Sequence, residues 1–433
     1  MNIRFIDLFA GTGGIRLGLE QAAQELGFNT ECVISSDIDK KCQETYEMNF
    51  GEKPVGDIRG LKEVSPFNFL LGGFPCQPFS YAGKQRGFGD TRGTLFFEIE
   101  RLLKDYSPNA FLLENVRGLT THDDGRTFQT ILEHLRALDY GVVSLVLNSS
   151  SFGVPQNRVR VYILGLKGGI PRMTLKSDQG ASDSHKFKER NLGSLFENRY
   201  TLVKDILETS VDAKYHCTPE FVEKLGLAVE GDFERLHGMR LIDYRNGNSL
   251  HSWDLGLKGK CTQEERALMN ALIANRRLKK FGTHQDGKRL TVQQIATFYK
   301  SPKIETLLAS LGKKGYVKAV DDAYNPVAGN MSFEVFKFLD PESISITLVS
   351  SDAERLGVVA DGVVRKITPR EAARIQGYPD SYVVHPNDSV AYRQFGNAVA
   401  VPVVAAVLKD FLSLNFRPVR TSESRLSQIA AAV

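Results

Sequence analysis

A single cysteine stands between two prolines at the end of an apolar run. The run is FNFLLGGF, residues 67–74, and Pro75, Cys76, Gln77 and Pro78 follow it. Proline fixes its own φ and donates no backbone hydrogen bond, so a strand over this run must end here. A thiolate is a strong nucleophile, and its pKa falls near the start of a helix. The spacing predicts a nucleophile held rigidly at a strand end, although a lone cysteine is more often a small buried hydrophobe.

Charged side chains also stand at the ends of two other apolar runs. AFLLENV, residues 110–116, carries Glu114 near its end, and Arg158 and Arg160 open the run that continues to residue 165. A carboxyl group in such a run loses hydration energy unless it is paired or used in chemistry. The two arginines alternate onto one face of an extended strand. We expect these three side chains at the ends of buried strands, as a functional group or as an ordinary salt bridge.

A glycine-rich turn follows the first apolar run, in FIDLFAGTGGIRLGLE at 5–20. Gly11, Gly13 and Gly14 let the backbone turn tightly and approach a ligand closely. Position 16 is an arginine, so the G-x-G-x-x-G spacing of pyrophosphate-binding turns is absent. The pattern predicts a nucleotide-like ligand, with a turn that binds nothing as the alternative.

Two acidic residues are suited to the rest of such a ligand. Asp37 ends the second apolar run, 26 residues after Gly11, where a carboxylate can accept ribose hydroxyls. Asp57 stands beside Ile58 in the short loop VGDIRG. An acid next to an aliphatic side chain suits an adenine ring, which offers an exocyclic amine and an apolar face.

These residues need a fold that brings distant strand ends together. Helical patterns such as IRLGLEQAAQEL and TLFFEIERLLKDY separate the apolar runs. Near-continuous apolar strands alternating with helices indicate a mostly parallel sheet covered on both faces, the doubly wound α/β fold. Ligands of such sheets bind at the carboxyl ends of the strands. The expected strands are 3–9, 31–37, 67–74, 110–116, 141–148 and 160–166.

A long polar loop follows the cysteine. SYAGKQRGFGDTRG, residues 80–93, contains four glycines together with Lys84, Arg86 and Arg92. A loop of this length inside a compact domain is usually functional and often a lid. Its basic residues suit a phosphate backbone.

The bulk properties indicate a globular protein with two domains. At 433 residues the chain exceeds the size at which one core usually stops growing, and it is 42% hydrophobic and 24% charged. No apolar run reaches the roughly 18 residues of a membrane span, and the first residues lead directly into a strand rather than a signal peptide. The five cysteines, at 32, 42, 76, 217 and 261, form no C-x-x-C pair. We therefore expect a cytoplasmic protein with no membrane partner, no disulfide framework and no metal.

One segment is strongly basic. Residues 254–318 hold 14 lysines and arginines against five acidic residues, a net charge of +9 in a chain whose total is +4. Such a segment suits a polyanion, although a solvated helical surface has a similar composition. Within it, LTVQQIATFYKSPKIETLLASLGKKGYVK predicts two helices, a glycine turn and a strand. A winged helix-turn-helix and a plain helical bundle both fit this pattern.

Together these motifs resemble the DNA (cytosine-5)-methyltransferase family, of the bacterial and phage restriction-modification type. The resemblance covers residues 1–170 and about 345–412. Six motifs occur in the order of the family: FAGTGG, GFPCQPFS, ENVRGL, QNRVRVYILG, RKITPREAARIQGYP and QFGNAVAVP.

The resemblance implies a covalent mechanism. The Cys76 thiolate adds to carbon 6 of cytosine, and this makes carbon 5 able to attack a methyl sulfonium. Glu114 binds the ring at N3 and the exocyclic amine. Arg158 and Arg160 hold the base edge and orient Cys76 or Glu114. No base that removes the carbon 5 proton is evident, and water can serve. The target cytosine must be flipped out of the duplex.

The family's cofactor is S-adenosyl-L-methionine, and the resemblance places its binding residues on both parts of the chain. Asn397 is expected to open a helix that closes this pocket. The expected cofactor residues are Phe9, Gly11, Gly13, Gly14, Asp37, Ile38, Asp57, Ile58, Pro75 and Asn397.

The expected partner is double-stranded DNA, bound by a monomer associated with the bacterial nucleoid. The resemblance divides the chain into a catalytic part at 1–171, an inserted target-recognition domain at 172–355 and a return segment at 356–433. Its DNA-facing residues are expected to be Gln77, Ser80, Lys84, Arg86, Arg92, Thr347 and Leu348.

Two alternatives remain open at this point. Cytosine-5 methylation of tRNA or another RNA uses the same fold, but the large basic insert favours DNA. A non-catalytic DNA-binding relative is disfavoured because Cys76, Glu114 and Arg160 are all present.

Overall fold

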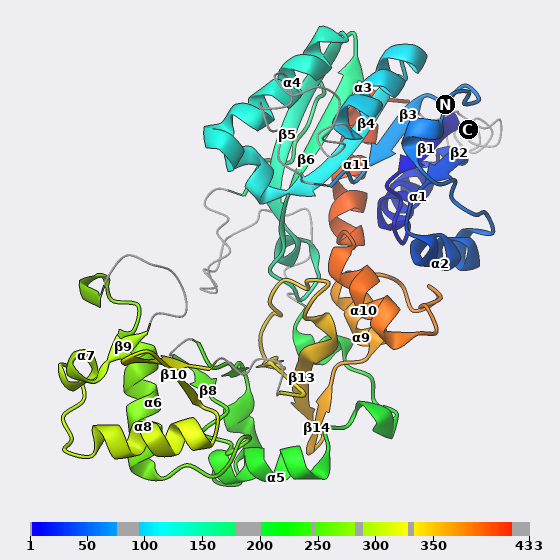
Figure 1. Ribbon diagram of the computed structural model, residues 1–433. Helices are drawn as coiled ribbons and strands as arrows, with labels where there is room; N and C mark the ends of the chain where they lie inside the picture. The colour runs from blue at the N-terminus through cyan, green and yellow to red at the C-terminus, as the bar shows by residue number, and fades with distance from the viewer. Residues whose placement is uncertain are drawn as a thin grey trace. The chain divides into compact units, whose positions relative to one another are not determined.

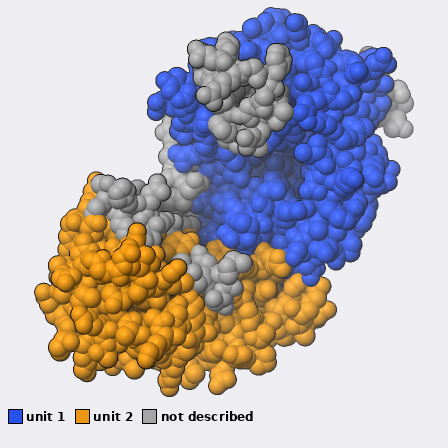
Figure 2. Space-filling model, viewed as in Figure 1, with its two compact units in different colours: residues 1–206, 344–353, 369–433 blue, residues 207–343, 354–368 orange. Residues whose placement is uncertain are grey.

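The computed structural model describes residues 2–75, 95–178, 201–244, 247–281, 289–327 and 333–417. The chain forms two compact units (Figure 2). Unit 1 comprises Met1–Ile206, Ile344–Ala353 and Pro369–Val433, and unit 2 comprises Leu207–Ser343 and Glu354–Thr368. These limits differ from the expected boundaries after 171 and 355, because residues 203–206 pack with a helix of unit 1 and residues 356–366 form strands of unit 2.

Unit 1 is built on a six-stranded sheet. Its strand order is β2-β1-β3-β4-β6-β5, and all strands are parallel except β6, which runs antiparallel to β4 and β5. The predicted doubly wound, mostly parallel sheet is therefore confirmed. The strands are β1 (Asn2–Leu8), β2 (Asn29–Ser36), β3 (Phe69–Gly72), β4 (Ala110–Val116), β5 (Tyr140–Asn148) and β6 (Val159–Lys167).

Helices cover both faces of this sheet (Figure 1). One face packs against α1 (Gly14–Leu26) and α11 (Val401–Asn415), and the other packs against α3 (Leu95–Tyr106) and α4 (Arg126–Ala137). Both faces of the strands are buried, which explains their near-continuous apolar runs. Unit 1 also contains α2 (Lys40–Phe50), α9 (Pro369–Ile375) and α10 (Asp388–Asn397).

The C-terminal helix completes the core of unit 1. Residues 388–415, which include α11, are long and apolar enough to cross a membrane by length and composition. Most of this stretch is buried, and the apolar side chains of α11 pack against α1 and the sheet. An apolar helix that is mostly buried in this way is part of the protein core.

The sheet has a switch point between β1 and β3. From β1 the chain passes to β2 on one side, and it then returns to β3 on the other side. Leu8 and Gly72 are register partners at the carboxyl ends of the two strands. The glycine turn and the segment that leads to Cys76 therefore leave the sheet side by side, at the position where open α/β sheets bind ligands.

Unit 2 contains α5 (Pro219–Ala228) and a five-stranded sheet of order β14-β13-β12-β7-β8. These strands are β14 (Val363–Lys366), β13 (Leu356–Ala360), β12 (Lys337–Phe338), β7 (Arg240–Leu241) and β8 (Ser249–Leu250).

The basic segment forms a second small structure within unit 2. Three helices pack with a three-stranded antiparallel sheet of order β10-β11-β9 around their own core. A plain helical bundle is therefore wrong, and the winged helix-turn-helix prediction agrees with the observed elements. They are α6 (Gln263–Asn275), β9 (Leu290–Thr291), α7 (Val292–Ala296), α8 (Ile304–Lys313), β10 (Val317–Val320) and β11 (Ala323–Pro326).

Candidate active site

A buried ion pair lies at the end of β4. Glu114 Oε1 is 3.2 Å from Arg160 Nε, and Glu114 is only 8% exposed. In the β4–β6 register Glu114 lies opposite Tyr162, two positions from Arg160. Because side chains alternate along a strand, Glu114 and Arg160 point to the same face of the sheet.

Burial raises the pKa of the Glu114 carboxyl, while the positive charges of Arg160 and Arg158 act in the opposite direction. The net pKa lies above the ordinary value for a glutamate. This carboxyl keeps its proton to a higher pH than an exposed glutamate does, as a group that donates a proton or a hydrogen bond requires.

The segment that leads to Cys76 passes beside this carboxyl. A Cβ atom added to Gly73 would lie 3.7 Å from Glu114 Oε2 and 3.3 Å from Ile15 Cδ1. Gly73 therefore lies within van der Waals range of the Glu114 carboxyl, and the chain leaves β3 close to it. The expected site residues of the following loop lie outside the described residues; they are Cys76, Gln77, Ser80, Lys84, Arg86 and Arg92.

Asn115 anchors this segment and was not among the expected site residues. Its Nδ2 donates to the Phe74 carbonyl at 2.9 Å, two residues before Cys76, and its Oδ1 accepts from the Val116 amide at 2.8 Å. The side chain is buried. The signal in the sequence was an amide directly after Glu114 in an otherwise apolar strand.

Arg158 binds backbone rather than the carboxyl. Its guanidinium donates to the carbonyls of Leu348 at 2.8 Å and Ala398 at 2.6 Å, and more distantly to Gly396. Burial, together with the nearby Arg160, lowers the pKa of Arg158 to about 9. These bonds join β6 to the return segment, so the structure places Arg158 in a supporting position and leaves Arg160 as the arginine beside Glu114.

The two residues expected to face DNA at the end of the insert are also held by the residues just before β6. The Leu348 side chain is fully buried, and its amide donates to Gln156 Oε1 at 2.8 Å. The Thr347 hydroxyl donates to the Asn157 carbonyl. The structure does not place Leu348 on a DNA-facing surface, because Gln156 and Arg158 hold its backbone against the core of unit 1.

The glycine turn has a backbone conformation that residues with a side chain rarely adopt. Gly11 and Gly13 have φ of 53° and 75°, and Phe9 also has a positive φ of 54°. A Cβ atom on Gly13 would lie 2.3 Å from the Phe50 ring, and one on Gly14 would lie 2.4 Å from the Tyr378 hydroxyl. The turn is therefore tightly packed at Gly13 and Gly14, and its backbone strain lies at Phe9 rather than at the glycines.

Asp37 joins this turn to the end of β2. Its Oδ2 accepts from the Gly11 amide at 2.8 Å, and its Oδ1 accepts from the Asp39 amide at 2.8 Å. Next to it, the Ile38 side chain is 75% exposed. A carboxylate and an exposed apolar side chain thus stand together just after the end of β2, beside the glycine turn.

The four other expected cofactor residues discussed next occupy different environments. Asp57 is bound by the Arg59 side chain, whose hydrogen bond lowers the pKa of Asp57, while Ile58 packs into the core. The apolar surface at this edge therefore comes from Ile38 and not from Ile58. Pro75 is exposed at the end of the described segment. Asn397 is the last residue of α10, so it ends a helix rather than opening one.

The return segment also pins the glycine turn. The Tyr382 hydroxyl donates to the Thr12 carbonyl at 2.7 Å, and the Thr12 and Tyr378 hydroxyls are 2.7 Å apart. The sequence alone did not indicate these tyrosines, since nothing local shows that residues 366 positions apart meet. Tyr378 lies within the motif RKITPREAARIQGYP and Tyr382 lies three residues after its end, which was the only available signal.

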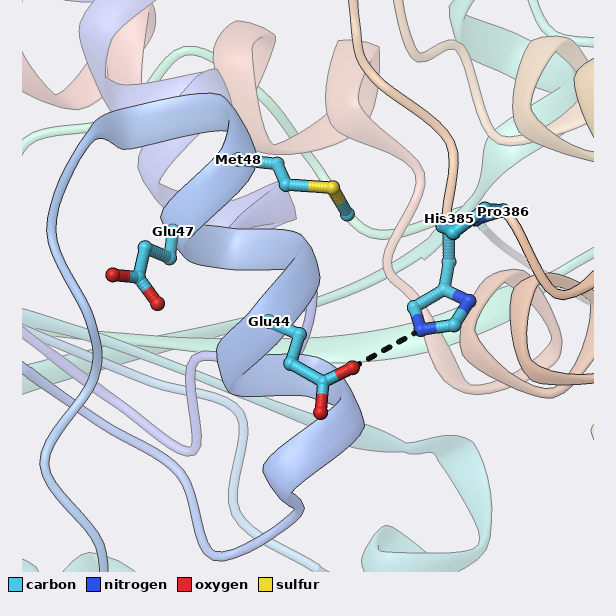
Figure 3. Close-up of a pocket in the computed structure, with 5 residues that line it drawn as sticks. All are labelled: Glu44, Glu47, Met48, His385 and Pro386. Atoms are coloured by element: carbon cyan, nitrogen blue, oxygen red, sulfur yellow. Dashed lines mark hydrogen bonds and ion pairs between the residues drawn. The ribbon is translucent and has the colours of Figure 1, made fainter.

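A surface pocket of about 380 Å³ lies on the outer side of α2. Figure 3 shows Met48 and Glu44 directed toward His385, with the Glu44–His385 ion pair of 3.4 Å between them, and Glu47 directed away. Its lining includes none of the residues discussed above, and we do not assign it to the active site. In the described part of the chain no cluster of three or more His, Cys, Asp or Glu side chains could hold a metal ion.

Comparison with known proteins decides the family. The family model described as C-5 cytosine-specific DNA methylase matches residues 3–413. The chain belongs to the C-5 cytosine-specific DNA methylase family. It is a DNA (cytosine-5) methyltransferase, which requires a methyl donor and a DNA substrate, and the predicted family and enzyme class are confirmed.

Relatives cover almost the whole methyltransferase. Type II methyltransferase M.BanI of Aneurinibacillus aneurinilyticus is 61% identical over 96% of this chain and 97% of its own length. Type II methyltransferase M.HgiCI of Herpetosiphon aurantiacus is 63% identical over 94% of this chain and 97% of its own length. These relatives favour DNA methylation over the RNA alternative.

Solved structures agree with the methylase fold. A putative DNA modification methyltransferase encoded within an E. coli prophage superposes with a TM-score of 0.52 and 20% identity over 95% of this chain and 99% of its own. The S. pombe Dnmt2 methyltransferase superposes with a TM-score of 0.51 and 18% identity over 96% of this chain and all of its own. At these identities the likeness concerns the fold alone.

Proposed function

We propose that this methyltransferase modifies carbon 5 of a cytosine flipped out of duplex DNA, through a covalent adduct of Cys76 at carbon 6, with S-adenosylmethionine as the methyl donor. The observation that carries the proposal is the buried Glu114–Arg160 pair, whose carboxyl has a raised pKa beside the exit of β3. A cytosine ring that receives a nucleophile at carbon 6 needs a proton donor of this kind at N3.

Cys76 is the nucleophile because the other cysteines are unsuited to ionise. Burial raises the pKa of all four described cysteines, to about 12 for Cys42 and Cys217 and about 11 for Cys261, and above the ordinary value for Cys32. A thiol with so high a pKa forms almost no thiolate at neutral pH. Cys76 is the only cysteine of the sequence outside this group, and it follows directly on the segment held by Asn115.

The chemical roles follow from these positions. The Cys76 sulfur forms a bond to carbon 6, and the electron pair of the C5–C6 double bond becomes available at carbon 5. Glu114 donates a proton or hydrogen bond to N3, and Arg160 holds the carboxyl in place. After methyl transfer to carbon 5, water takes the carbon 5 proton and the Cys76 thiolate leaves carbon 6, which restores the double bond. A proton that N3 received returns to Glu114.

The described residues fit the proposed donor, which supplies an electrophilic methyl group on a sulfonium. The enclosed glycine turn leaves room for backbone contact, Asp37 can accept ribose hydroxyls, and the exposed Ile38 can cover one face of adenine. Asp57 can accept the adenine amine if Arg59 turns aside. Phe9, Pro75 and Asn397 complete the proposed binding set.

We further infer that unit 2 contains the target-recognition domain and that the loop residues Gln77, Ser80, Lys84, Arg86 and Arg92 contact DNA. The relatives at 61% and 63% identity are named Type II methyltransferases, which supports a role in a bacterial restriction-modification system. We expect a cytoplasmic monomer acting on the nucleoid.

The test is methylation of a plasmid in vitro, followed by mapping of every converted cytosine. Wild-type protein is expected to produce 5-methylcytosine at one recurring sequence, and Cys76→Ser is expected to abolish transfer while retaining donor binding. Cys217→Ser changes the same atom at a buried cysteine of unit 2 and is expected to remain active. Full turnover by Cys76→Ser would disprove the nucleophile, and preference for tRNA over duplex DNA would disprove the substrate.

A further inference from the structure

The basic segment of unit 2 has the element order of a winged helix-turn-helix. In this segment β9, α7, α8, β10 and β11 follow one another, and β11 pairs with both β10 and β9. This order places two helices, joined by residues 297–303, in front of a β-hairpin. It is the arrangement of a helix-turn-helix with a wing, in which the second helix lies in the major groove of DNA.

The second helix, α8, has two contrasting faces. Its apolar side chains are buried in the local core: Ile304, Leu307, Leu308 and Leu311. Its opposite face exposes Glu305, Thr306, Ala309, Gly312 and Lys313. The centre of that face consists of the small residues Thr306, Ala309 and Gly312, so that another surface can approach the helix backbone closely.

Lysines lie at both ends of this exposed face. Lys300 and Lys303 precede the helix, and Lys313 is its last residue. Lys303 forms a 3.3 Å ion pair with Glu264, whereas Lys300 and Lys313 form no ion pair with other residues in the described ranges. A helix face with positive charge at each end is complementary to the two phosphate backbones that border a groove of duplex DNA.

The helix is fixed to its neighbour. Glu265 of α6 accepts hydrogen bonds from the Ser310 hydroxyl and from Lys314 Nζ, each at 2.7 Å. Burial acts to raise the pKa of Glu265, but these bonds lower it to about 2. The Glu265 carboxylate therefore stays charged across the physiological pH range. Capping boxes at Thr262 and Thr291 fix the starts of α6 and α7. Rigid mounting of this kind reduces the entropic cost of binding.

The wing is unsuited to the same role. Its turn between β10 and β11 exposes Asp321 and Asp322, of which Asp321 pairs with Arg289. Two carboxylates at the tip would repel phosphate groups. Of the wing and α8, only α8 therefore has a surface that suits the phosphate groups of DNA.

We propose that α8 inserts its exposed face into the major groove of duplex DNA and helps to select the sequence that is methylated. Lys300, Lys303 and Lys313 bind phosphates, while Glu305 and Thr306 contact base edges, where a glutamate can accept from the cytosine amine and a threonine can contact the thymine methyl group. This inference rests on the proposed function, since it takes duplex DNA as the substrate.

Matched alanine variants provide the test. Ala309 on α8 and Ala267 on α6 are both exposed, so Ala309→Glu and Ala267→Glu add the same charge and volume to two helices. We expect Ala309→Glu to weaken binding to a duplex that contains the mapped site by about tenfold or more, as disruption of a base contact in the groove does. Ala267→Glu should bind like wild type, and both variants should keep the wild-type thermal midpoint and donor affinity.

Two further variants separate the roles along the helix. Lys300→Gln with Lys313→Gln should lower the slope of log K against log salt by about 0.9 for each phosphate that the protein no longer neutralises. Thr306→Val should alter the tolerance for substitution at one base pair, without changing the salt slope.

The outcomes distinguish this inference from the proposed function. Absence of 5-methylcytosine with wild-type protein would defeat the proposed function itself. If wild-type protein methylates normally but Ala309→Glu and Ala267→Glu bind DNA equally well, only the role of α8 is overturned. The exposed face of α8 would then be a candidate surface for a protein partner.

Discussion

At the scale of single residues, the Glu114 carboxyl is under two opposing influences. Burial disfavours its charged form, while Arg160 at 3.2 Å favours it. Because the balance lies on the side of a raised pKa, Arg160 sets how far up the pH scale the acid remains protonated.

Removal of the Arg160 charge should therefore shift the pH dependence of methyl transfer. In Arg160→Met the carboxyl loses its nearest positive charge, so the pKa of Glu114 rises further. The alkaline limb of kcat/KM should move to higher pH, while Glu114→Gln should lower kcat by about a hundredfold or more. Profiles of kcat/KM against pH would measure this. Arg126→Met, which removes an exposed arginine paired with Asp123, is the control and should leave the limb in place; an unshifted limb in Arg160→Met would refute the coupling.

A second buried carboxyl links pH to stability. Asp7 lies on β1 beneath the glycine turn, fully buried, and accepts from the Tyr46 hydroxyl at 3.2 Å. Burial raises its pKa from 3.8 to about 7, against the opposing charge of Arg16. Its Oδ1 has no hydrogen-bond partner in the described ranges.

The sign of the effect follows from the extra proton of the folded state. Between pH 3.8 and about 7 the folded protein holds this proton more tightly than the unfolded chain, so the free energy of unfolding falls as pH rises through this window. The fall is at most about 1.4 kcal/mol per pH unit for one group. Asp7→Asn should flatten this dependence in urea unfolding at several pH values. Asp105→Asn, at an exposed carboxyl, should follow the wild-type curve; parallel curves for all three proteins would contradict the assignment.

At the scale of elements, α1 and α11 pack so closely that a glycine is required between them. A Cβ atom on Gly18 would lie 2.6 Å from Val404 Cβ and 3.0 Å from the Ala405 amide nitrogen. Neither neighbour is the end of a flexible side chain. The helices must separate to admit even one methyl group.

Gly18→Ala should therefore destabilise the protein, although alanine is the better helix former. Overpacking costs about 1–3 kcal/mol, which exceeds the gain of about 1 kcal/mol from helix propensity. Gly312→Ala in α8 is the matched control, since its Cβ would meet nothing closer than 3.8 Å, and it should be neutral or stabilising. Urea unfolding of each unit would measure both changes. A Gly18→Ala protein as stable as wild type would show that the helices shift at little cost.

At the scale of the whole molecule, the sequence predicted what depends on local pattern. The six strands of unit 1 follow from apolar runs, and the glycine turn follows from its residues. The reversed direction of β6 was not predictable, because an apolar run carries no direction. The roles of Arg158 and Leu348 depend on contacts 190 residues apart, and Arg276, which the sequence places in a basic surface, is only 3% exposed. The residue types indicated which chemistry the site could perform, whereas only the folded structure shows which residues contact one another.

Because Arg276 is buried, contact between the basic segment and DNA must be tested at its exposed neighbours. Lys279 and Lys280 are exposed beside it, so their reversal to glutamate tests DNA contact without disturbing the core. We expect weaker duplex binding and a salt slope reduced by about 0.9 for each phosphate that is released. Lys62→Glu with Lys104→Glu makes the same change at exposed lysines of unit 1 and should have less effect. Equal slopes in fluorescence anisotropy for the two double variants would make this part of the segment structural.

Because α11 lies near the end of the chain, the core of unit 1 can be completed only late in synthesis. The sheet of unit 1 is complete once β6 has emerged at Lys167, but the helix that covers α1 and one face of that sheet ends at Asn415. At translation rates of about 5–20 residues per second, the interval is on the order of tens of seconds. During that time the ribosome carries a nascent chain with an uncovered apolar face, which is a natural substrate for chaperones. A message that breaks before the codons for α11 would thus leave this face of the sheet uncovered.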